Sequence, residues 1–253
     1  MTRTRSCFSR SLLCALLLIL LAADGLQASV PTEPPTFSNP LVIDNPFSPF
    51  VVDGVQSHRG KSDGERTAVV NLFKAETRDF SWGGGTVSTR ILQETEFEAG
   101  VLEEISQNFF AQADDGTVYY FGEVVDIYED GQIVDHEGSW LVGGATLPGD
   151  PPDTGNAADP TIFMPGNPEV GDQFKPEDLF PLVDETVTIL AMDVRVRVEA
   201  GRYLNAMKVR ETSLLPDSDP EKKWYAPGLG AVKTRASGEK LGLIASTLEH
   251  QED

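Results

Sequence analysis

Side chains from residue 66 onward alternate between apolar and polar with a period of two residues. The alternating runs are rich in β-branched and aromatic residues and span residues 67–73, 86–97, 102–113, 117–128, 132–142, 185–199, 203–215, 222–224, 231–234 and 241–247. A period of two is typical of β-strands that bury one face, whereas no window of ten residues has the 3.6-residue period of an amphipathic helix. We therefore predict an all-β fold, a single antiparallel sheet curved into a half-barrel or open barrel with a long proline-rich loop.

Short glycine- and aspartate-containing segments separate these runs. The clearest is Asp114-Asp115-Gly116, and Glu129-Asp130-Gly131 and Glu98-Ala99-Gly100 repeat the pattern. Aspartate followed by glycine favours tight hairpin turns because glycine adopts positive φ angles without strain. We expect hairpins at all three places and a positive φ at Gly116.

Two proline-rich segments interrupt the alternation. Residues 29–65 form a predicted leader, extended because proline blocks both helix and sheet hydrogen bonds, and Phe37, Phe47 and Phe50 are expected to pack on the domain edge rather than to serve as a peptide ligand. Residues 143–181 form the long loop. Long loops in compact domains are usually functional or mobile, so we expect this one to cover a binding site.

The N-terminus has the layout of a secretory signal peptide. Arg3, Arg5 and Arg10 precede an apolar run over residues 12–23, and small and polar residues follow up to Ala28. Cleavage after Ala28 divides the chain into a signal peptide (1–28), the leader (29–65) and an antiparallel β domain (66–253). We expect the protein to be exported, to the periplasm or beyond the cell.

Alternatives for this segment are cleavage after Gly25, a membrane anchor and a lipoprotein signal that uses Cys14. The apolar run is shorter than the roughly 18 to 20 residues that span a bilayer, and bulky Leu13 precedes Cys14 where a lipoprotein signal needs a small residue. The mature chain is then expected to have no transmembrane segment. It also loses both cysteines, Cys7 and Cys14, so it has no thiol chemistry.

The chain has 40 acidic and 20 basic residues, and its formal net charge is −20. Removal of residues 1–28 takes away three arginines and one aspartate and makes the chain more acidic still. Such a charge repels phosphate backbones and anionic lipid. We therefore expect no nucleic-acid partner.

Several motifs resemble a family of exported bacterial proteins of uncharacterised function, over about residues 45–243. They are the runs 119–123 (YYFGE), 128–131 (YEDG), 136–140 (HEGSW), 164–165 (MP) and 168–172 (PEVGD). The segments 198–203 (VEAGRY) and 225–230 (YAPGLG) are similar to periplasmic domains of unknown function. That likeness implies a half-barrel related to lipoprotein carriers. A cysteine often stands in those proteins where this chain has Ala206, so no role of that thiol carries over.

Recognised catalytic and metal motifs are missing from the sequence. His136 and Glu137 point to opposite faces of a strand, so they form one site only across a bulge. In the loop, Asp150, Asp153, Asn156 and Asp159 offer oxygen ligands without the spacing of a calcium loop, and whether residues 150–159 bind calcium stays open. Gly138-Ser139-Trp140 lacks the Gly-x-Ser-x-Gly pattern of a nucleophile elbow. We predict no metal site and no cofactor.

Strand 117–121 carries large apolar groups on both faces, Val118 and Tyr120 on one and Tyr119 and Phe121 on the other. One face is expected to lie on the core, and the long loop or a ligand to cover the other. The leading hypothesis is an exported, non-catalytic binding protein for a lipid or another apolar molecule, with its ligand held by Tyr119, Phe121, Trp140 and Trp224. The alternatives are an exported carboxylate-dependent hydrolase and a calcium-stabilised surface protein.

Overall fold

The computed structural model describes residues 30–216 and 218–251. The predicted signal peptide, both cysteines and the predicted cleavage site lie outside this range. The described residues contain fifteen β-strands and no helix, so none of them forms a helix long and apolar enough to cross a membrane.

The strands follow one another in three groups. The first consists of β1 (Val55–Ser62), β2 (Glu65–Trp82), β3 (Gly85–Glu98), β4 (Val101–Gln112) and β5 (Val118–Glu129). Short strands follow as β6 (Gln132–Asp135), β7 (Trp140–Val142), β8 (Gly155–Ala157) and β9 (Thr161–Met164). The third group is β10 (Gln173–Leu179), β11 (Val183–Arg197), β12 (Arg202–Thr212), β13 (Glu221–Ala226), β14 (Gly230–Arg235) and β15 (Lys240–Ser246).

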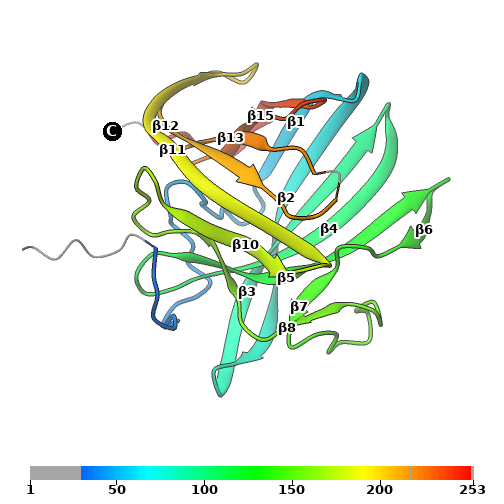
Figure 1. The fold of residues 1–253 in the computed structure, drawn as a ribbon, viewed down its shortest axis with the longest axis vertical. Helices are drawn as coiled ribbons and strands as arrows, with labels where there is room; N and C mark the ends of the chain where they lie inside the picture. Colours follow the sequence, from blue (N-terminus) through cyan, green and yellow to red (C-terminus); the bar gives the residue numbers. More distant parts are fainter. Residues whose placement is uncertain (1–29, 217, 252–253) are drawn as a thin grey trace, which may run out of the picture.

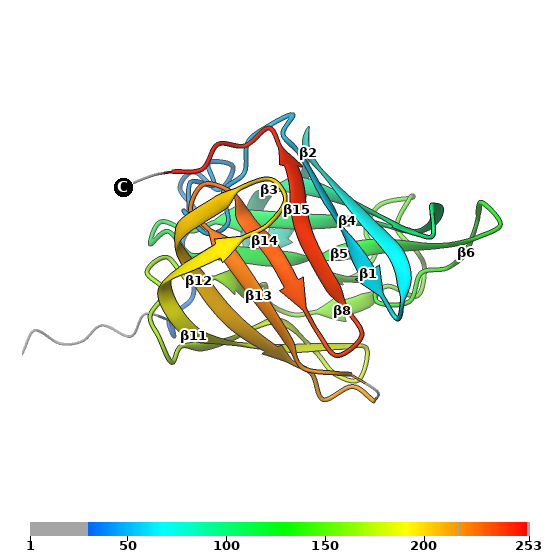
Figure 2. The same ribbon diagram turned by 90° about the horizontal axis from the view of Figure 1, so that it is seen from above.

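All fifteen strands belong to one sheet that curls into a nearly closed barrel (Figures 1 and 2). The main path runs β10-β11-β12-β13-β14-β15-β1-β2-β3-β4-β5-β7-β8, with β6 and β9 also paired to β5. Every pairing is antiparallel except that of β7 with β8. The predicted all-β class and single curved sheet are confirmed.

The barrel has one open seam, between β9 and β10. These strands lie side by side, and the hydroxyl of Thr161 donates a hydrogen bond to the carbonyl of Pro176 across the seam. Proline has no N–H to give to a ladder, and the β10 register shifts between Phe174 and Glu177. Pro176 therefore cannot donate a ladder hydrogen bond at the point where β10 passes β9.

The sheet begins at Val55 rather than at residue 66, because β1 lies within the range assigned to the leader. The sequence did not predict this strand because it lacks the alternation of apolar residues. Its inward positions are occupied by Gln56 and His58, which are polar, and by Gly60, which has no side chain. The long loop likewise contains β8, β9 and β10. Conversely, the strand expected over 132–142 is broken at residues 136–139, where Gly138 has a φ of +90°.

Both faces of β5 are buried, and they belong to two separate clusters. Val118 and Tyr120 lie in the cluster inside the barrel, and Tyr119 and Phe121 lie in a cluster on its outside. The ring of Phe37 from the leader completes the outer cluster, with centroids 5.7 Å from those of both Tyr119 and Phe121. The expectation that leader phenylalanines pack on the domain is confirmed at this residue.

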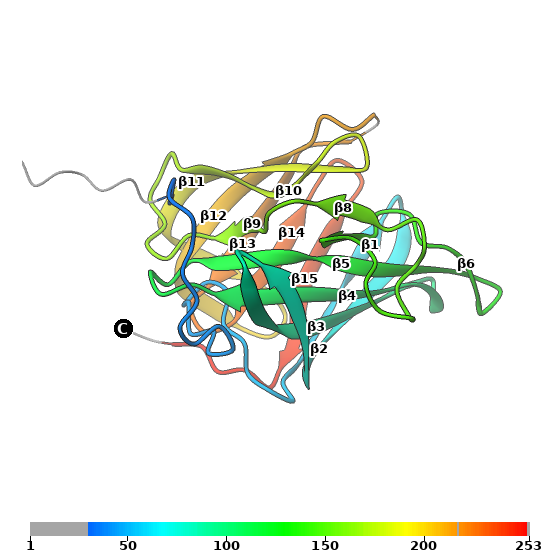
Figure 3. The same ribbon diagram turned by 90° about the horizontal axis from the view of Figure 1, so that it is seen from below.

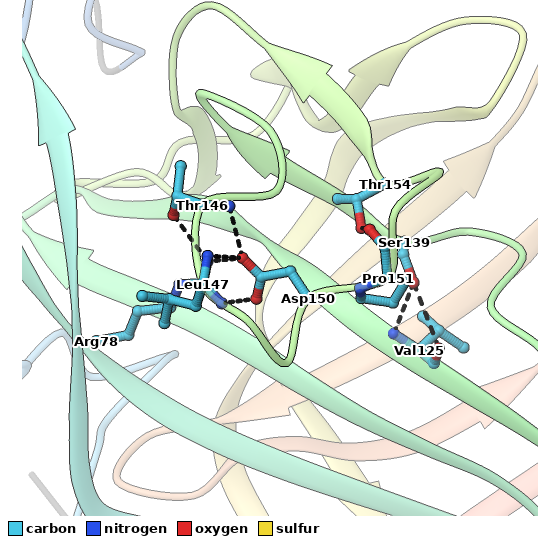
Figure 4. A network of polar contacts seen from close by, with 8 residues as sticks. All are labelled: Arg78, Val125, Ser139, Thr146, Leu147, Asp150, Pro151 and Thr154. Atoms are coloured by element: carbon cyan, nitrogen blue, oxygen red, sulfur yellow. Dashed lines mark hydrogen bonds and ion pairs between the residues drawn. The ribbon is translucent and has the colours of Figure 1, made fainter.

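The long loop is fastened over the same outer cluster by one ion pair (Figure 4). The guanidinium of Arg78 lies 4.9 Å from the ring centroids of both Phe80 and Phe109 and pairs with the carboxylate of Asp150. Asp150 also accepts hydrogen bonds from the backbone N–H groups of Thr146 and Leu147. The loop is thus part of the packed structure on this face.

The leader closes one end of the barrel, where β4 meets β5 (Figure 3). Ile43 and Phe47 are buried in the inner cluster. Between them, the buried amide of Asn45 donates hydrogen bonds to the carbonyls of Gly116 and Pro165. We call residues 43–50 the plug.

Candidate binding cavity

The barrel interior holds a cavity of about 430 Å³. Small-molecule sites in proteins typically measure roughly 300 to 1,000 Å³, so this volume is of the right size for an organic ligand. The cavity is lined by residues of the plug, of the long loop and of strands all round the barrel.

The register of β3, β4 and β5 shows how the lining changes along the barrel. Nearest the plug, Phe110 on β4 lies opposite Tyr120 on β5. Farther along β4, Asn108 and then Ser106 follow on the same face, with Glu123 opposite Asn108. At the far end Glu104 lies opposite Glu96. The cavity therefore has an aromatic end at the plug and an acidic end away from it.

Eight glutamates line the cavity, contributed by β3, β4, β5, β10, β11, β13 and the turn before β15: Glu94, Glu96, Glu104, Glu123, Glu177, Glu185, Glu221 and Glu239. Burial raises the pKa of Glu96 to about 7, with further contributions from the charges of Glu94 and Glu104. Burial also raises the pKa values of Glu94, Glu104 and Glu239. Some of these carboxyl groups therefore carry protons near neutral pH.

Lys223 on β13 is the one lysine or arginine among the described lining residues. Its Nζ lies 2.5 Å from Oε2 of buried Glu211 and 3.8 Å from Oε2 of Glu221. Burial by itself lowers the pKa of Lys223, but the charges of Glu211 and Glu185 outweigh burial and hold this pKa well above its usual value. Lys223 is thus a fixed ammonium that neutralises only part of the acidic end.

Glu123 and Glu177 both line the cavity and share a hydrogen bond. Burial, together with the charge of Glu177, raises the pKa of Glu123 well above its usual value. The hydroxyl of Tyr120 donates a 2.5 Å hydrogen bond to Oδ1 of Asn108 beside them. Because the pKa values of both carboxyl groups are raised, this pair retains a proton to higher pH than an exposed glutamate does.

The remaining polar lining groups differ in whether they have a partner. His58 Nε2 lies 3.0 Å from the carbonyl of Ala231, and burial lowers the pKa of this imidazole. Gln56 donates to the carbonyl of Leu229. Asn71 differs, because its buried Oδ1 has no hydrogen-bond partner within the described residues. This oxygen remains available to a donor group inside the cavity.

The four residues predicted to hold a ligand do not meet in one site. Tyr119 and Phe121 are buried in the outer cluster, and Trp140 is buried in the inner cluster with its ring edge-on to Tyr120. Trp224 lies on the outer face of β13, where it is half-buried between two lysines. None of the four lines the cavity, which is formed by other residues.

The residues considered for metal binding are engaged elsewhere. Nδ1 of His136 lies 2.9 Å from Oδ1 of Asp126 and 2.9 Å from the carbonyl of Val125. In the loop, Asp150 pairs with Arg78, and Asp159 accepts a hydrogen bond from the indole of Trp82. Residues 30–216 and 218–251 contain no group of three or more histidine, aspartate or glutamate side chains arranged to hold a metal ion.

No family model, curated protein or solved structure matches this chain. Function is therefore inferred from the cavity. Sequence reasoning missed the lining glutamates because a polar residue in an alternating strand is ordinarily assigned to the solvent face. One signal was present: Glu94 and Glu96 share a face of β3 in a stretch where Gln93, Thr95 and Phe97 occupy the other.

Proposed function

We propose that this protein is a non-catalytic binding protein that holds a small organic cation with an apolar part inside the barrel. The observation that carries the proposal is the lining of the cavity, eight glutamates against one lysine, with an aromatic wall at the opposite end. Buried carboxylates need a counter-charge, and the existing one, Lys223, is already paired with Glu211. A ligand ammonium group supplies that charge.

The aromatic end suits the apolar part of the same ligand. Phe50, Phe110 and Phe163 line it with Leu92 and Val187, and the plug closes it. This polarity also argues against the purely apolar ligand expected from the sequence. A lipid tail next to the carboxyl groups would displace the water that hydrogen-bonds to them and would offer no hydrogen bond in its place. The ligand class we propose is therefore an amphiphilic amine.

Three probes with the same alkyl chain test this proposal: octylammonium, octanoate and octanol. We expect titration calorimetry at pH 8 to detect saturable binding of octylammonium and much weaker binding of the other two. Equal affinity for all three contradicts a role for the acidic end. Binding of none contradicts the proposal as a whole.

Matched variants locate the site. Glu104 points into the cavity, and Glu103, its neighbour on β4, points to the outer face. Glu104→Gln is expected to weaken octylammonium binding by about fivefold or more, because it removes one carboxylate from a buried site. Glu103→Gln is expected to leave the affinity unchanged, and a similar loss in both variants places the ligand elsewhere.

A carboxylate-dependent hydrolase is the second candidate, supported by the Glu123 and Glu177 pair. A carboxyl group that keeps its proton at neutral pH is suited to general acid catalysis. Glycoside hydrolysis, however, uses carboxyl groups at least about 5 Å apart, whereas these two share a hydrogen bond. Hydrolysis of aryl glycosides or aryl esters that Glu123→Gln abolishes would favour this candidate over the binding protein.

A further inference from the structure

A row of basic side chains crosses the outside of the barrel on six adjacent strands. The register places its members opposite one another from β12 to β2, in the order Arg210, Lys222, Arg235, Lys240, Lys61 and Arg66. Residues directly opposite share a face of the sheet, and all six are exposed. With strands about 4.8 Å apart, this basic row is about 24 Å long.

A second, shorter row runs beside it, two residues along each strand. It contains Lys208 on β12, Trp224 on β13, Lys233 on β14 and Arg59 on β1. The Nζ atoms of Lys208 and Lys233 lie 5.3 and 5.0 Å from the ring centroid of Trp224. An aromatic ring thus lies among the cations at the centre of this basic face.

The basic face is largely without internal counter-charge. Arg59 pairs with exposed Glu199 at 3.1 Å, whereas in the described part of the chain no carboxylate lies within ion-pair distance of the other eight basic side chains. Burial lowers the pKa of Lys233, and the nearby charges of Arg235 and Lys240 lower it further. The positive groups on this face therefore repel one another.

This distribution is uneven for so acidic a chain. The two rows hold nine of the 20 lysines and arginines of the full sequence. On β12 and β13 the acidic residues Glu211 and Glu221 lie on the opposite face of the sheet, and Glu239, in the turn before β15, lines the cavity as well. Like charges opposite one another on neighbouring strands destabilise the folded state. A bound anionic partner would offset this repulsion, so the arrangement points to such a partner.

We propose that the basic face binds a linear acidic polysaccharide, laid across the strands with its carboxylates along the basic row and a sugar ring against Trp224. The face is the outside of a barrel and is therefore convex. A flexible polymer can follow a convex surface along its whole length, whereas a planar bilayer contacts only a narrow part of it. Non-specific binders of single-stranded nucleic acid combine a basic groove with successive aromatic platforms, whereas these two rows offer one aromatic residue. The proposal concerns the outside of the barrel and is independent of the ligand in the cavity.

Polygalacturonate and its fully methyl-esterified form are matched probes, since they share a backbone and differ in charge. We expect the unmodified protein to bind polygalacturonate in low salt and to release it as salt is added. We expect no binding of the methyl-esterified form, which has no carboxylate. The double variant Lys222→Gln, Arg235→Gln is expected to weaken binding by at least about tenfold. Lys74→Gln removes a charge of β2 outside both rows and is expected to have little effect.

Two further probes decide between classes of partner. Tighter binding of single-stranded oligothymidine, or of vesicles that contain anionic lipid, than of polygalacturonate overturns the polysaccharide assignment. Failure to bind polygalacturonate in low salt overturns it as well, as does binding that the double variant leaves unchanged. Both substituted side chains are exposed and lie opposite one another, so the double variant should melt at the same temperature as the unmodified protein or above it, as like-charge repulsion is relieved.

Discussion

Arg78 and Asp150 form a two-point ion pair between the sheet and the long loop. The Nη1–Oδ1 distance is 2.7 Å and the Nη2–Oδ2 distance is 2.8 Å, and the side chains are only 7% and 4% exposed. Hydrogen bonds from Arg78, Leu147 and Thr146 hold the pKa of Asp150 below its usual value despite the opposing effect of burial. A buried ion pair therefore holds the loop on the outer cluster, and loss of either partner would leave the other charge buried and unpaired.

Asp150→Asn should destabilise the protein, because it leaves the guanidinium of Arg78 buried without a counter-charge. Breaking a buried ion pair from one side typically costs about 3 to 5 kcal/mol, and chemical denaturation measures the loss. Asp153→Asn is the control, since Asp153 is exposed in the same loop. Two variants of equal stability would show that the loop does not depend on this pair.

Deletion of residues 150–159 should likewise lower the melting temperature without creating a saturable site for an apolar dye. The loop covers Phe80, Phe109 and Phe121 as part of the packed structure. Its loss therefore exposes an apolar surface that binds dye non-specifically, rather than a defined ligand site. A deletion variant that keeps its melting temperature and binds dye at one saturable site would restore the outer face as a binding site.

The cavity glutamates should make the protein less stable as the pH rises from 5 to 8. The pKa of Glu96 rises from 4.5 to about 7 on folding, so between these values the folded state binds more protons than the unfolded state. Stability then falls with increasing pH. The paired carboxylates Asp150 and Asp184 have lowered pKa values and give the opposite slope in more acidic solution. The lowered pKa of buried His58 also opposes the decline, but only below 6.5, the ordinary pKa of histidine. Melting temperatures across this range measure the effect.

Glu96→Gln should reduce that decline, because glutamine keeps the shape and cannot ionise. Glu103→Gln, on the outer face of β4, should leave the pH profile as it is. A melting temperature that rises between pH 5 and pH 8 in the unmodified protein would contradict the assignment of buried, proton-binding carboxyl groups to the cavity.

Gly116→Val should destabilise the β4–β5 hairpin by about 1 kcal/mol or more, since Gly116 has a φ of +85° that β-branched residues avoid. Gly149→Ala is the matched control, because no atom lies within 4 Å of its added Cβ. Thermal melting of the two variants should differ clearly. Asp114→Ala acts on another contact, since Asp114 accepts hydrogen bonds from Thr36 and Ser38 and so holds the leader.

The sequence predicts local features of this fold well. Positive φ at Gly116 and the two-sided burial of Val118 to Phe121 both follow from residue types that are neighbours in the chain. The barrel interior does not, because which face of β3 points inward depends on its pairing with β2 and β4. Glu94 and Glu96 look solvent-facing until those registers are known, and β1 has no apolar pattern at all. The six residues of the basic row are likewise scattered along the sequence, and only the registers of the six strands bring them into line.

Proton release during ligand binding tests the central claim most directly. An ammonium group entering the acidic end favours ionised carboxylates, so octylammonium binding at pH 7 should expel protons from Glu96 and its neighbours. Calorimetry in two buffers of different ionisation enthalpy counts those protons. We predict a net release, together with an affinity that rises from pH 6 to pH 8. Binding without proton release, at an affinity independent of pH, would contradict the proposal that the cavity glutamates hold the cation.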